Sequence, residues 1–236
     1  MQKSEIARNT LSHQVYAWLR QQIISGQIKQ GEHLSEQLVS ETLGVSATPV
    51  REALRMLNGE GIVELEGRRG ARVVEPTSQD IRACFQVRKA LECLALRQAC
   101  ERLTADDIAE LERIRQLLAQ ESSPDPRAFL DADRAFHGFF LERAENSWLD
   151  QFLSRLTDFL YVVRQPLLQT STLETPRLEH LAITNAVLDA NIDEAERLLG
   201  KHLDRVCEDV IARQSEQAQA LRKQADVATA VGVLGK

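Results

Sequence analysis

A carboxylate and three imidazoles in the second half of the chain have the residue types and spacing of a metal site. Asp133 and His137 lie four residues apart in "DADRAFHGFF", so both project from one face if this segment is helical. His180 in "LEHLAI" and His202 in "GKHLDRV" lie on two later segments. Helical bundles build metal sites from ligands on facing helices, two of them from a single helix in some cases. The set therefore predicts a site for Zn²⁺, Ni²⁺ or a similar divalent ion.

Other interpretations of these residues stay open. Each histidine taken alone is better explained as a side chain that only satisfies its hydrogen bonds. A bound metal could also be purely structural, or it could activate water in a metal-dependent enzyme. A catalytic zinc usually keeps three protein ligands, an open position and a nearby general base. Four ligands would fill most of the shell here, and no further acid–base pair stands out near these motifs, so we predict no enzymatic activity.

Arg88 is a cation within an otherwise apolar stretch that includes Phe85, Val87 and Leu91. A buried guanidinium needs an anionic partner. One interpretation is a structural ion pair with Glu92, one helical turn later. The other is that Arg88 binds the carboxylate of a small organic acid whose other oxygens reach the metal.

Helices must position these residues, and the composition favours helices. Hydrophobic residues make up 43% of the 236 residues and aromatic residues only 5%, so Leu, Ala, Val and Ile must fill the core. No strand signal follows Ser78, and "TADDI" and "NIDEA" are typical helix starts. We expect helices at 78–101, 104–120, 126–144, 147–168, 174–190 and 192–223.

Composition and charge narrow the class of protein. The N-terminal "MQKSEIARNT" lacks the apolar core of a signal peptide, and no run approaches a membrane span in length. The four cysteines form no C-x-x-C pair, which favours reduced, buried thiols over zinc ligands or disulfides. The net charge is −6, all of it from residues beyond 75. We expect a cytoplasmic protein without indiscriminate affinity for nucleic acid, although a local basic edge is compatible with the neutral first part.

The first 75 residues predict three helices followed by a β-hairpin. Ser35 can cap the second helix, and Gly44 can end it. The third helix follows after a few residues, and Pro49 costs nothing in its first turn because the N–H groups there are free. Such a helix start is a good seat for a phosphate. The runs "GIVELE" and "ARVVEP", joined by "GRRG", then predict two strands, so the whole indicates a helix-turn-helix with a hairpin wing.

This first part closely resembles the winged helix-turn-helix of GntR-family bacterial transcription regulators. The stretch "LSEQLVSETLGVSATPVREALRMLNGEGIVELEGRRGARVVEP" carries the resemblance, which covers about residues 10–76, and "TPVREAL" and "GRRGARV" are its specific parts. The resemblance implies that the start of the third helix enters the major groove and that the wing tip reaches the minor groove. Carried over position by position, it implies DNA contacts from Gln37, Ser46, Thr48, Arg51, Arg68, Arg69, Gly70 and Arg72.

One position departs from the family pattern. The family often has Arg where this chain has Ala47. A guanidinium there could read guanine with two hydrogen bonds, and a methyl group cannot. The operator is therefore expected to differ from the usual one, or Arg51 and the wing carry more of the affinity.

The second part resembles the FCD effector domain that defines the FadR branch of these regulators. "VRKALECLALRQACERLTADDI" looks like its opening helix, and the resemblance covers about residues 78–220. Its D-x-x-x-H, H, H metal pattern matches Asp133, His137, His180 and His202. The resemblance implies an all-helical, homodimeric domain that binds a small organic-acid effector at the metal and at Arg88.

The sequence as a whole predicts a mainly α fold, a winged helix-turn-helix followed by an all-helical bundle. We expect a DNA-binding domain in residues 1–76, an effector-binding and dimerisation domain in 77–225, and a disordered tail in 226–236. The predicted function is transcription regulation at an inverted-repeat operator of double-stranded DNA. Repression that a small carboxylate relieves is favoured over activation.

Overall fold

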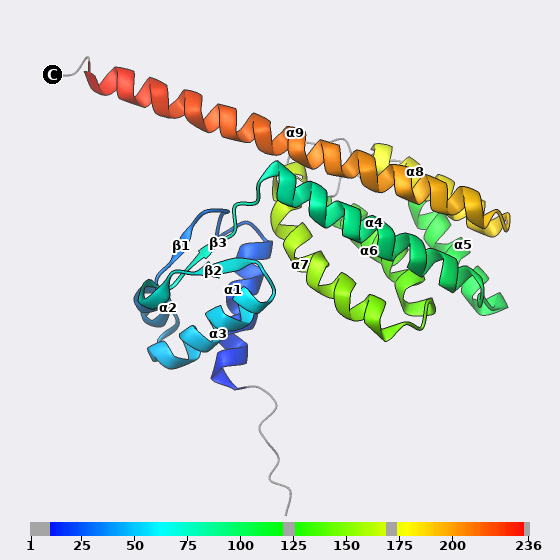
Figure 1. Ribbon diagram of the computed structural model, residues 1–236, viewed down its shortest axis with the longest axis horizontal. Helices are drawn as coiled ribbons and strands as arrows, with labels where there is room; N and C mark the ends of the chain where they lie inside the picture. The colour runs from blue at the N-terminus through cyan, green and yellow to red at the C-terminus, as the bar shows by residue number, and fades with distance from the viewer. Residues whose placement is uncertain (1–9, 120–125, 169–173, 234–236) are drawn as a thin grey trace, which may run out of the picture. The chain divides into compact units, whose positions relative to one another are not determined.

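The computed structural model describes residues 10–119, 126–168 and 174–233, and it is mainly α-helical as predicted (Figure 1). Within the described ranges, strands are short and occur only between His33 and Val73. None of the helices in the described ranges is long and apolar enough to cross a membrane.

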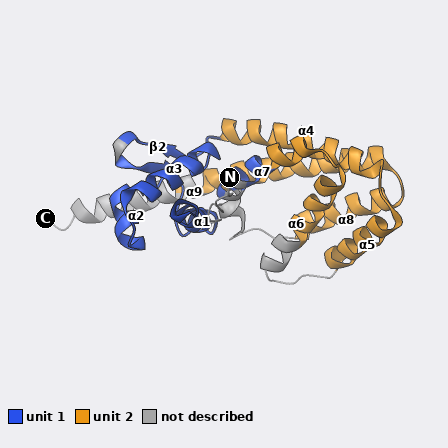
Figure 2. Cartoon of the chain, turned by 90° about the horizontal axis from the view of Figure 1, so that it is seen from below, with its two compact units in different colours: residues 1–77, 154–165 blue, residues 78–153, 166–236 orange. Residues whose placement is uncertain are grey.

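The chain divides into two compact units (Figure 2). Unit 1 comprises residues 1–77 together with 154–165, and unit 2 comprises the remainder. The first boundary lies one residue from the expected one, but the inclusion of 154–165 was not expected. Residues 154–165 belong to unit 1 because Val162 is buried in its core. The Gln30 side-chain amide also donates a hydrogen bond to the carbonyl oxygen of Val162 (2.7 Å).

Unit 1 is built from three short helices and a three-stranded antiparallel sheet of order β1-β3-β2. Helices α1 and α3 pack together, and the sheet and α2 complete the core. Strand β1 was not predicted, because two residues are too short to show an alternating pattern. The elements are α1 (Leu11–Ile24), β1 (His33–Leu34), α2 (Glu36–Leu43), α3 (Ala47–Gly59), β2 (Val63–Leu65), the 3₁₀ turn η1 (Gly67–Arg69) and β3 (Ala71–Val73).

Local chemistry sets the boundaries of the helix-turn-helix. The Ser35 hydroxyl accepts from the Leu38 N–H at the start of α2, and Gly44 ends this helix in the left-handed conformation (φ 66°). Ser46 is the N-cap of α3, with an extended backbone and no side-chain cap bond. Pro49 is buried in the first turn, where its missing N–H leaves no helical hydrogen bond unmade.

Unit 2 is a helical bundle in which α4 packs on α6 and α9, and α8 packs on α5 and α9. Its core is filled by large apolar side chains from several helices, including Leu96, Phe136, Ile183 and Leu199. The helices follow the predicted ranges within a few residues except at the C-terminal end. They are α4 (Ser78–Cys100), α5 (Ala105–Ala119), α6 (Pro126–Arg143), α7 (Ser147–Leu168), α8 (Glu174–Leu188) and α9 (Ile192–Val233).

Residues 226–233 of the expected tail belong to helix α9, and a disordered tail at 226–236 stays a prediction. Helix α9 continues through Val233, ten residues beyond the expected end at 223, and residues 234–236 lie outside the described part. The segment after 215 is rich in Ala and Gln and contains no Gly or Pro before Gly232, so nothing in it interrupts a helix.

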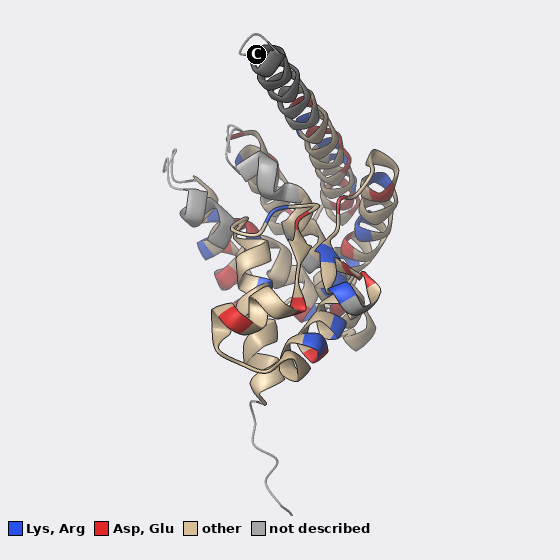
Figure 3. Cartoon of the chain, turned by 90° about the vertical axis from the view of Figure 1, so that its left-hand side faces the viewer, with Lys and Arg blue, Asp and Glu red and all other residues tan. Residues whose placement is uncertain are grey.

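Charged residues are distributed over both units. Lys/Arg and Asp/Glu positions are interspersed along the visible helices (Figure 3), in keeping with the equal numbers of both signs in residues 1–75. The four cysteines are free thiols, as expected, and burial raises the pKa of Cys84, Cys93 and Cys100 to about 11. These thiols are therefore protonated at neutral pH.

The backbone at position 70 requires glycine, and a substitution there tests the structure of the wing. The φ of Gly70 is 119°, and a Cβ there would lie 2.0 Å from the backbone oxygen of Leu34. Gly70→Ala is expected to lower the free energy of unfolding of unit 1 by about 3 kcal/mol or more, since backbone must move as well as adopt a strained conformation. Gly67→Ala is the control, with φ 64° but no neighbour within 4 Å, and should cost only about 1–2 kcal/mol. Urea denaturation measures both, and equal losses would contradict this account.

Candidate metal and DNA-binding sites

The four predicted metal ligands come together inside unit 2. Asp133 and His137 lie one turn apart on α6, His180 comes from α8 and His202 from α9. One ring nitrogen from each of the three histidines lies within 4.8 Å of the other two. Asp133 Oδ1 is 3.7 Å from His137 Nε2 and 3.8 Å from His180 Nε2, and the Nε2 atoms of His180 and His202 are 3.1 Å apart. Three helices thus converge on one small volume.

The cluster is almost closed to solvent. His180 and His202 are 0% and 2% exposed, and Asp133 is 8% exposed. The Phe136 ring stacks on His180 with centroids 4.2 Å apart and makes a T-shaped contact with the His137 ring. Polar groups placed this deeply need partners, since an unsatisfied buried polar atom is costly.

Two glutamates that the sequence did not single out as site residues supply such partners. Glu92 accepts from His137 Nδ1 (2.7 Å), and Glu179 accepts from His202 Nδ1 (2.7 Å) while Arg205 holds it with two further hydrogen bonds. The spacing of residues in the sequence could not reveal these pairs, because each glutamate contacts a histidine on another helix. Glu179, for example, contacts His202 of α9 and not His180, which is its neighbour in sequence. A carboxylate on the outer nitrogen of a histidine is a common feature of metal sites, where it fixes the tautomer and the ring orientation.

The electrostatics favour ionised glutamates and a neutral histidine. Burial acts to raise the pKa of Glu92, but Arg88 and His137 outweigh it and lower the pKa to about 2. Burial likewise acts to raise the pKa of Glu179, but His202 and Arg205 lower it to about 2. Burial lowers the pKa of His202. An ionised carboxylate can only accept, so Nδ1 carries the proton and Nε2 of His202 presents its lone pair to the cluster.

The geometry of the cluster fits a divalent ion. His137 Nε2 is buried and has no hydrogen-bond partner among the described residues. Ligands at about 2.1 Å from one ion lie about 3.0 Å apart when adjacent in an octahedron and about 3.4 Å apart in a tetrahedron, and the 3.1 Å between the two other Nε2 atoms falls in this range. The same distance also suits a hydrogen bond from His180 to His202. Three imidazoles and one carboxylate could therefore hold Zn²⁺ or Ni²⁺.

Arg88 lies beside this cluster and not on a solvated face. It is 5% exposed, its Nε donates to Glu92 Oε1 (2.5 Å), and its guanidinium faces the Phe85 ring with the centroid 5.6 Å away. The charges of Glu92 and Asp133 both raise the pKa of Arg88, against the effect of burial, which is the largest single influence. The predicted structural ion pair with Glu92 is therefore present. An effector carboxylate on Arg88 stays a prediction.

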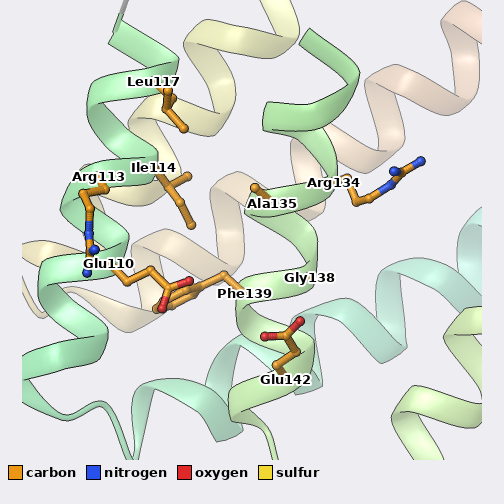
Figure 4. A pocket seen from close by; sticks show the side chains of 9 residues that line it. All are labelled: Glu110, Arg113, Ile114, Leu117, Arg134, Ala135, Gly138, Phe139 and Glu142. Atoms are coloured by element: carbon orange, nitrogen blue, oxygen red, sulfur yellow. The ribbon is translucent and has the colours of Figure 1, made fainter. Parts of the chain in front are cut away.

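A groove of about 530 Å³ lies elsewhere on unit 2, between α5 and α6 (Figure 4). Its lining includes none of the four predicted ligands and not Arg88. The lining residues are Glu110, Arg113, Ile114, Leu117, Arg134, Ala135, Gly138, Phe139 and Glu142.

The start of α3 in unit 1 presents several of the predicted DNA contacts to solvent. Ser46, Thr48 and Arg51 are exposed. Arg51 is held by Glu36 of α2 through two hydrogen bonds (3.0 and 2.6 Å), so its position is fixed by the neighbouring helix. Gln37 is also on α2 and donates to Glu41 (2.9 Å). These side chains lie on the two helices of the helix-turn-helix, as the sequence predicted.

The wing residues differ from one another in their surroundings. Arg69 is exposed at the tip, and Arg68 lies in the same turn, η1. Arg72 is exposed but donates to Glu66 and to the Gly31 carbonyl oxygen (2.7 Å each). Gly70 is buried, so its role in the structure is conformational, and a contact of Gly70 with DNA stays a prediction.

Two protein families match the two parts of the chain. Residues 11–73 match the bacterial regulatory proteins of the gntR family, and residues 83–205 match the FCD domain. The chain belongs to the GntR family of transcriptional regulators. It carries an FCD domain behind its DNA-binding domain, which confirms the resemblance seen in the sequence.

Known relatives agree with this assignment over most of their length. The HTH-type transcriptional regulator LutR of Bacillus subtilis is 31% identical in an alignment of 219 positions that covers 83% of this chain and 98% of LutR. The HTH-type transcriptional repressor RspR of Escherichia coli is 29% identical in an alignment of 207 positions that covers 85% of this chain and 89% of RspR. The structure of E. coli McbR/YncC shares the fold, with a TM-score of 0.71 over 89% of this chain and 99% of that one at 23% identity. This GntR/FCD chain is thus a DNA-binding transcriptional regulator and not an enzyme.

Metal binding can be tested by thermal unfolding. Zn²⁺ is expected to raise the unfolding midpoint of the chain by mass action, because it binds the native cluster, and a chelator should reverse the shift. His202→Ala should remove most of the shift, since it deletes one of the predicted ligands. His13→Ala is the control, because His13 is an exposed histidine of unit 1. An equal Zn²⁺ shift in both variants would contradict the predicted site.

Proposed function

We propose that this GntR/FCD regulator is a repressor that leaves its operator when a small carboxylate binds at a divalent metal ion in the FCD domain. The observation that carries the proposal is a buried guanidinium beside a buried cluster of one carboxylate and three imidazoles. A cation and a metal-ligand set at this depth form a site for an anion, because both would attract one and little water competes there.

Asp133, His137, His180 and His202 would hold the ion, with Zn²⁺ or Ni²⁺ the best match to the donors. The bound ion would supply a Lewis-acidic centre for one carboxylate oxygen. Arg88 would bind another oxygen of the same acid. It is suited to this because only its Nε is hydrogen-bonded to a described residue, which leaves donors on both Nη atoms.

DNA binding is proposed to use the start of α3 in the major groove and the wing in the minor groove. The exposed N-terminal turn of α3 offers free backbone N–H groups and a positive dipole end to a phosphate. Exposed Arg69 supports a role for the wing tip. The proposed contacts are Gln37, Ser46, Thr48, Arg51, Arg68, Arg69, Gly70 and Arg72.

A homodimer on an inverted repeat is proposed for the working form. Exposed apolar side chains on α4 and the first turns of α7 support it: Val87 is 50% exposed, Leu94 43%, Trp148 66% and Phe152 48%. Ala95 of α4 and Leu149 of α7 are buried in one apolar cluster, so the two helices contact each other there. Apolar surface of this kind marks an interface more often than a solvated face. A two-fold dimer would present two recognition helices to two half-sites.

Release of DNA requires that the acid favour one conformation of the protein strongly. Moving an equilibrium from nearly all bound to nearly all free takes a preference of about 5.5 kcal/mol. The bond of the acid to the metal ion and its ion pair with Arg88 can supply that preference only if both form in one conformation of the protein and not in the other. RspR, which is named a repressor, supports repression over activation.

The test combines ligand screening with operator binding. A panel of small mono-, di- and hydroxy-carboxylates is screened by thermal unfolding of the Zn²⁺-loaded chain, and operator DNA is obtained by selection from random sequence. The stabilising acid is expected to weaken operator binding at least tenfold in fluorescence anisotropy, and a chelator should abolish that effect. Arg88→Lys should keep Zn²⁺ binding but lose most of the response, because an ammonium cannot make the paired hydrogen bonds. Stabilisation by Zn²⁺ without a response to any acid would instead favour a purely structural metal.

A further inference from the structure

Glu92 contacts both halves of the proposed site at once. Its Oε1 accepts from Arg88 Nε (2.5 Å), and its Oε2 accepts from His137 Nδ1 (2.7 Å). The Glu92 and Arg88 side chains are 12% and 7% exposed, and that of His137 is 15% exposed. Water therefore screens these contacts little, and a change of charge at one partner is felt at the other.

Glu179 offers a comparison within the same cluster. It accepts from His202 Nδ1 at the same distance as Glu92 does from His137, 2.7 Å. Its cation, however, is Arg205, which also pairs with Asp209 and is 28% exposed. Glu179 therefore supports a metal ligand without contacting Arg88, whereas Glu92 does both.

We infer that Glu92 is a positioning residue that links metal binding at His137 to anion binding at Arg88, so that each favours the other. This inference rests on the metal and carboxylate site proposed above. In the absence of ligands the Glu92 carboxylate is divided between Arg88 and His137. A cation on His137 Nε2 makes the Nδ1–H a stronger donor, which draws the charge of Glu92 towards the imidazole. Arg88 is then less completely neutralised, and an external carboxylate binds it more tightly.

The linkage is measured as a ratio of two Zn²⁺ affinities. Zn²⁺ dissociation constants are determined for the full chain by competition with a chromophoric chelator, without acetate and with saturating acetate as the simplest carboxylate probe. The ratio of the two constants is the coupling factor. By thermodynamic reciprocity it must equal the factor by which Zn²⁺ strengthens acetate binding, which provides an internal check. The wild-type factor is expected to lie in the range of about 5–150.

Two isosteric variants separate coupling from support of a ligand. Glu92→Gln and Glu179→Gln should each weaken Zn²⁺ binding, by about 10–100-fold, because each removes a charged partner of a metal-binding histidine. Glu179→Gln should keep the wild-type coupling factor within about twofold, since Arg88 is untouched. Glu92→Gln should reduce the coupling factor at least fivefold, towards the part that direct contact of acetate with Zn²⁺ supplies.

Glu92→Gln leaves a buried guanidinium without its counter-charge and could misfold, so a second variant is needed to keep the test decisive. Glu92→Asp keeps the charge, but its shorter side chain cannot reach both partners, so it too should lose coupling. An unchanged factor in both Glu92 variants, or an equal loss in Glu179→Gln, would overturn the inference. If the wild-type chain binds Zn²⁺ but its coupling factor is 1, the inference about Glu92 is overturned and the proposed metal site is not. A wild-type chain that binds no Zn²⁺ would overturn the proposed site and the inference with it.

Discussion

The cost of burying charge is the constraint around which the FCD domain is organised. Arg88, Glu92 and Asp133 lie in or beside the core, and isolated ions there would be strongly unfavourable. Glu92 is stabilised by Arg88 on its own helix, α4, and by His137 on α6, whereas Asp133 of α6 lies close to His180 of α8. The chain of contacts from Arg88 through Glu92 to His137 therefore fixes α4 against α6. The contacts of Glu179 with His202 and Arg205 fix α8 against α9 in the same way.

The same constraint gives the site its chemistry. Arranging three imidazoles so that ring nitrogens face one another leaves too few internal donors for all the acceptors, and His137 Nε2 is the buried atom that shows it. A native core rarely keeps such an atom without a reason. An ion at the centre would bind one nitrogen of each histidine at once, and Arg88 would make the site attractive to an acid. The DNA-binding unit needs no comparable device, because six of its predicted DNA contacts are exposed: Gln37, Ser46, Thr48, Arg51, Arg69 and Arg72.

The sequence predicted the secondary-structure elements better than the side-chain contacts between helices. Helix positions, the cap at Ser35, the left-handed Gly44 and the i, i+4 pair of Asp133 and His137 follow from local rules, and the structure agrees with them. Glu92 and Glu179 could not be assigned, because their histidines lie on other helices and no spacing marks the contact. Burial of Val162 in unit 1 and the continuation of α9 to Val233 were also missed. Burial of Val162 depends on long-range packing, which a local pattern does not encode, whereas the continuation of α9 agrees with the lack of Gly and Pro before Gly232 and was overlooked.

The central claim is that one metal ion binds the three histidines and Asp133. X-ray absorption at the zinc edge of the Zn²⁺-loaded full-length chain tests it most directly. We expect a first shell of nitrogen and oxygen only, at about 2.0–2.2 Å, with the multiple-scattering signature of three imidazoles. A sulfur ligand at about 2.3 Å would contradict it, because the four free cysteines would then be binding the metal in place of the histidine cluster.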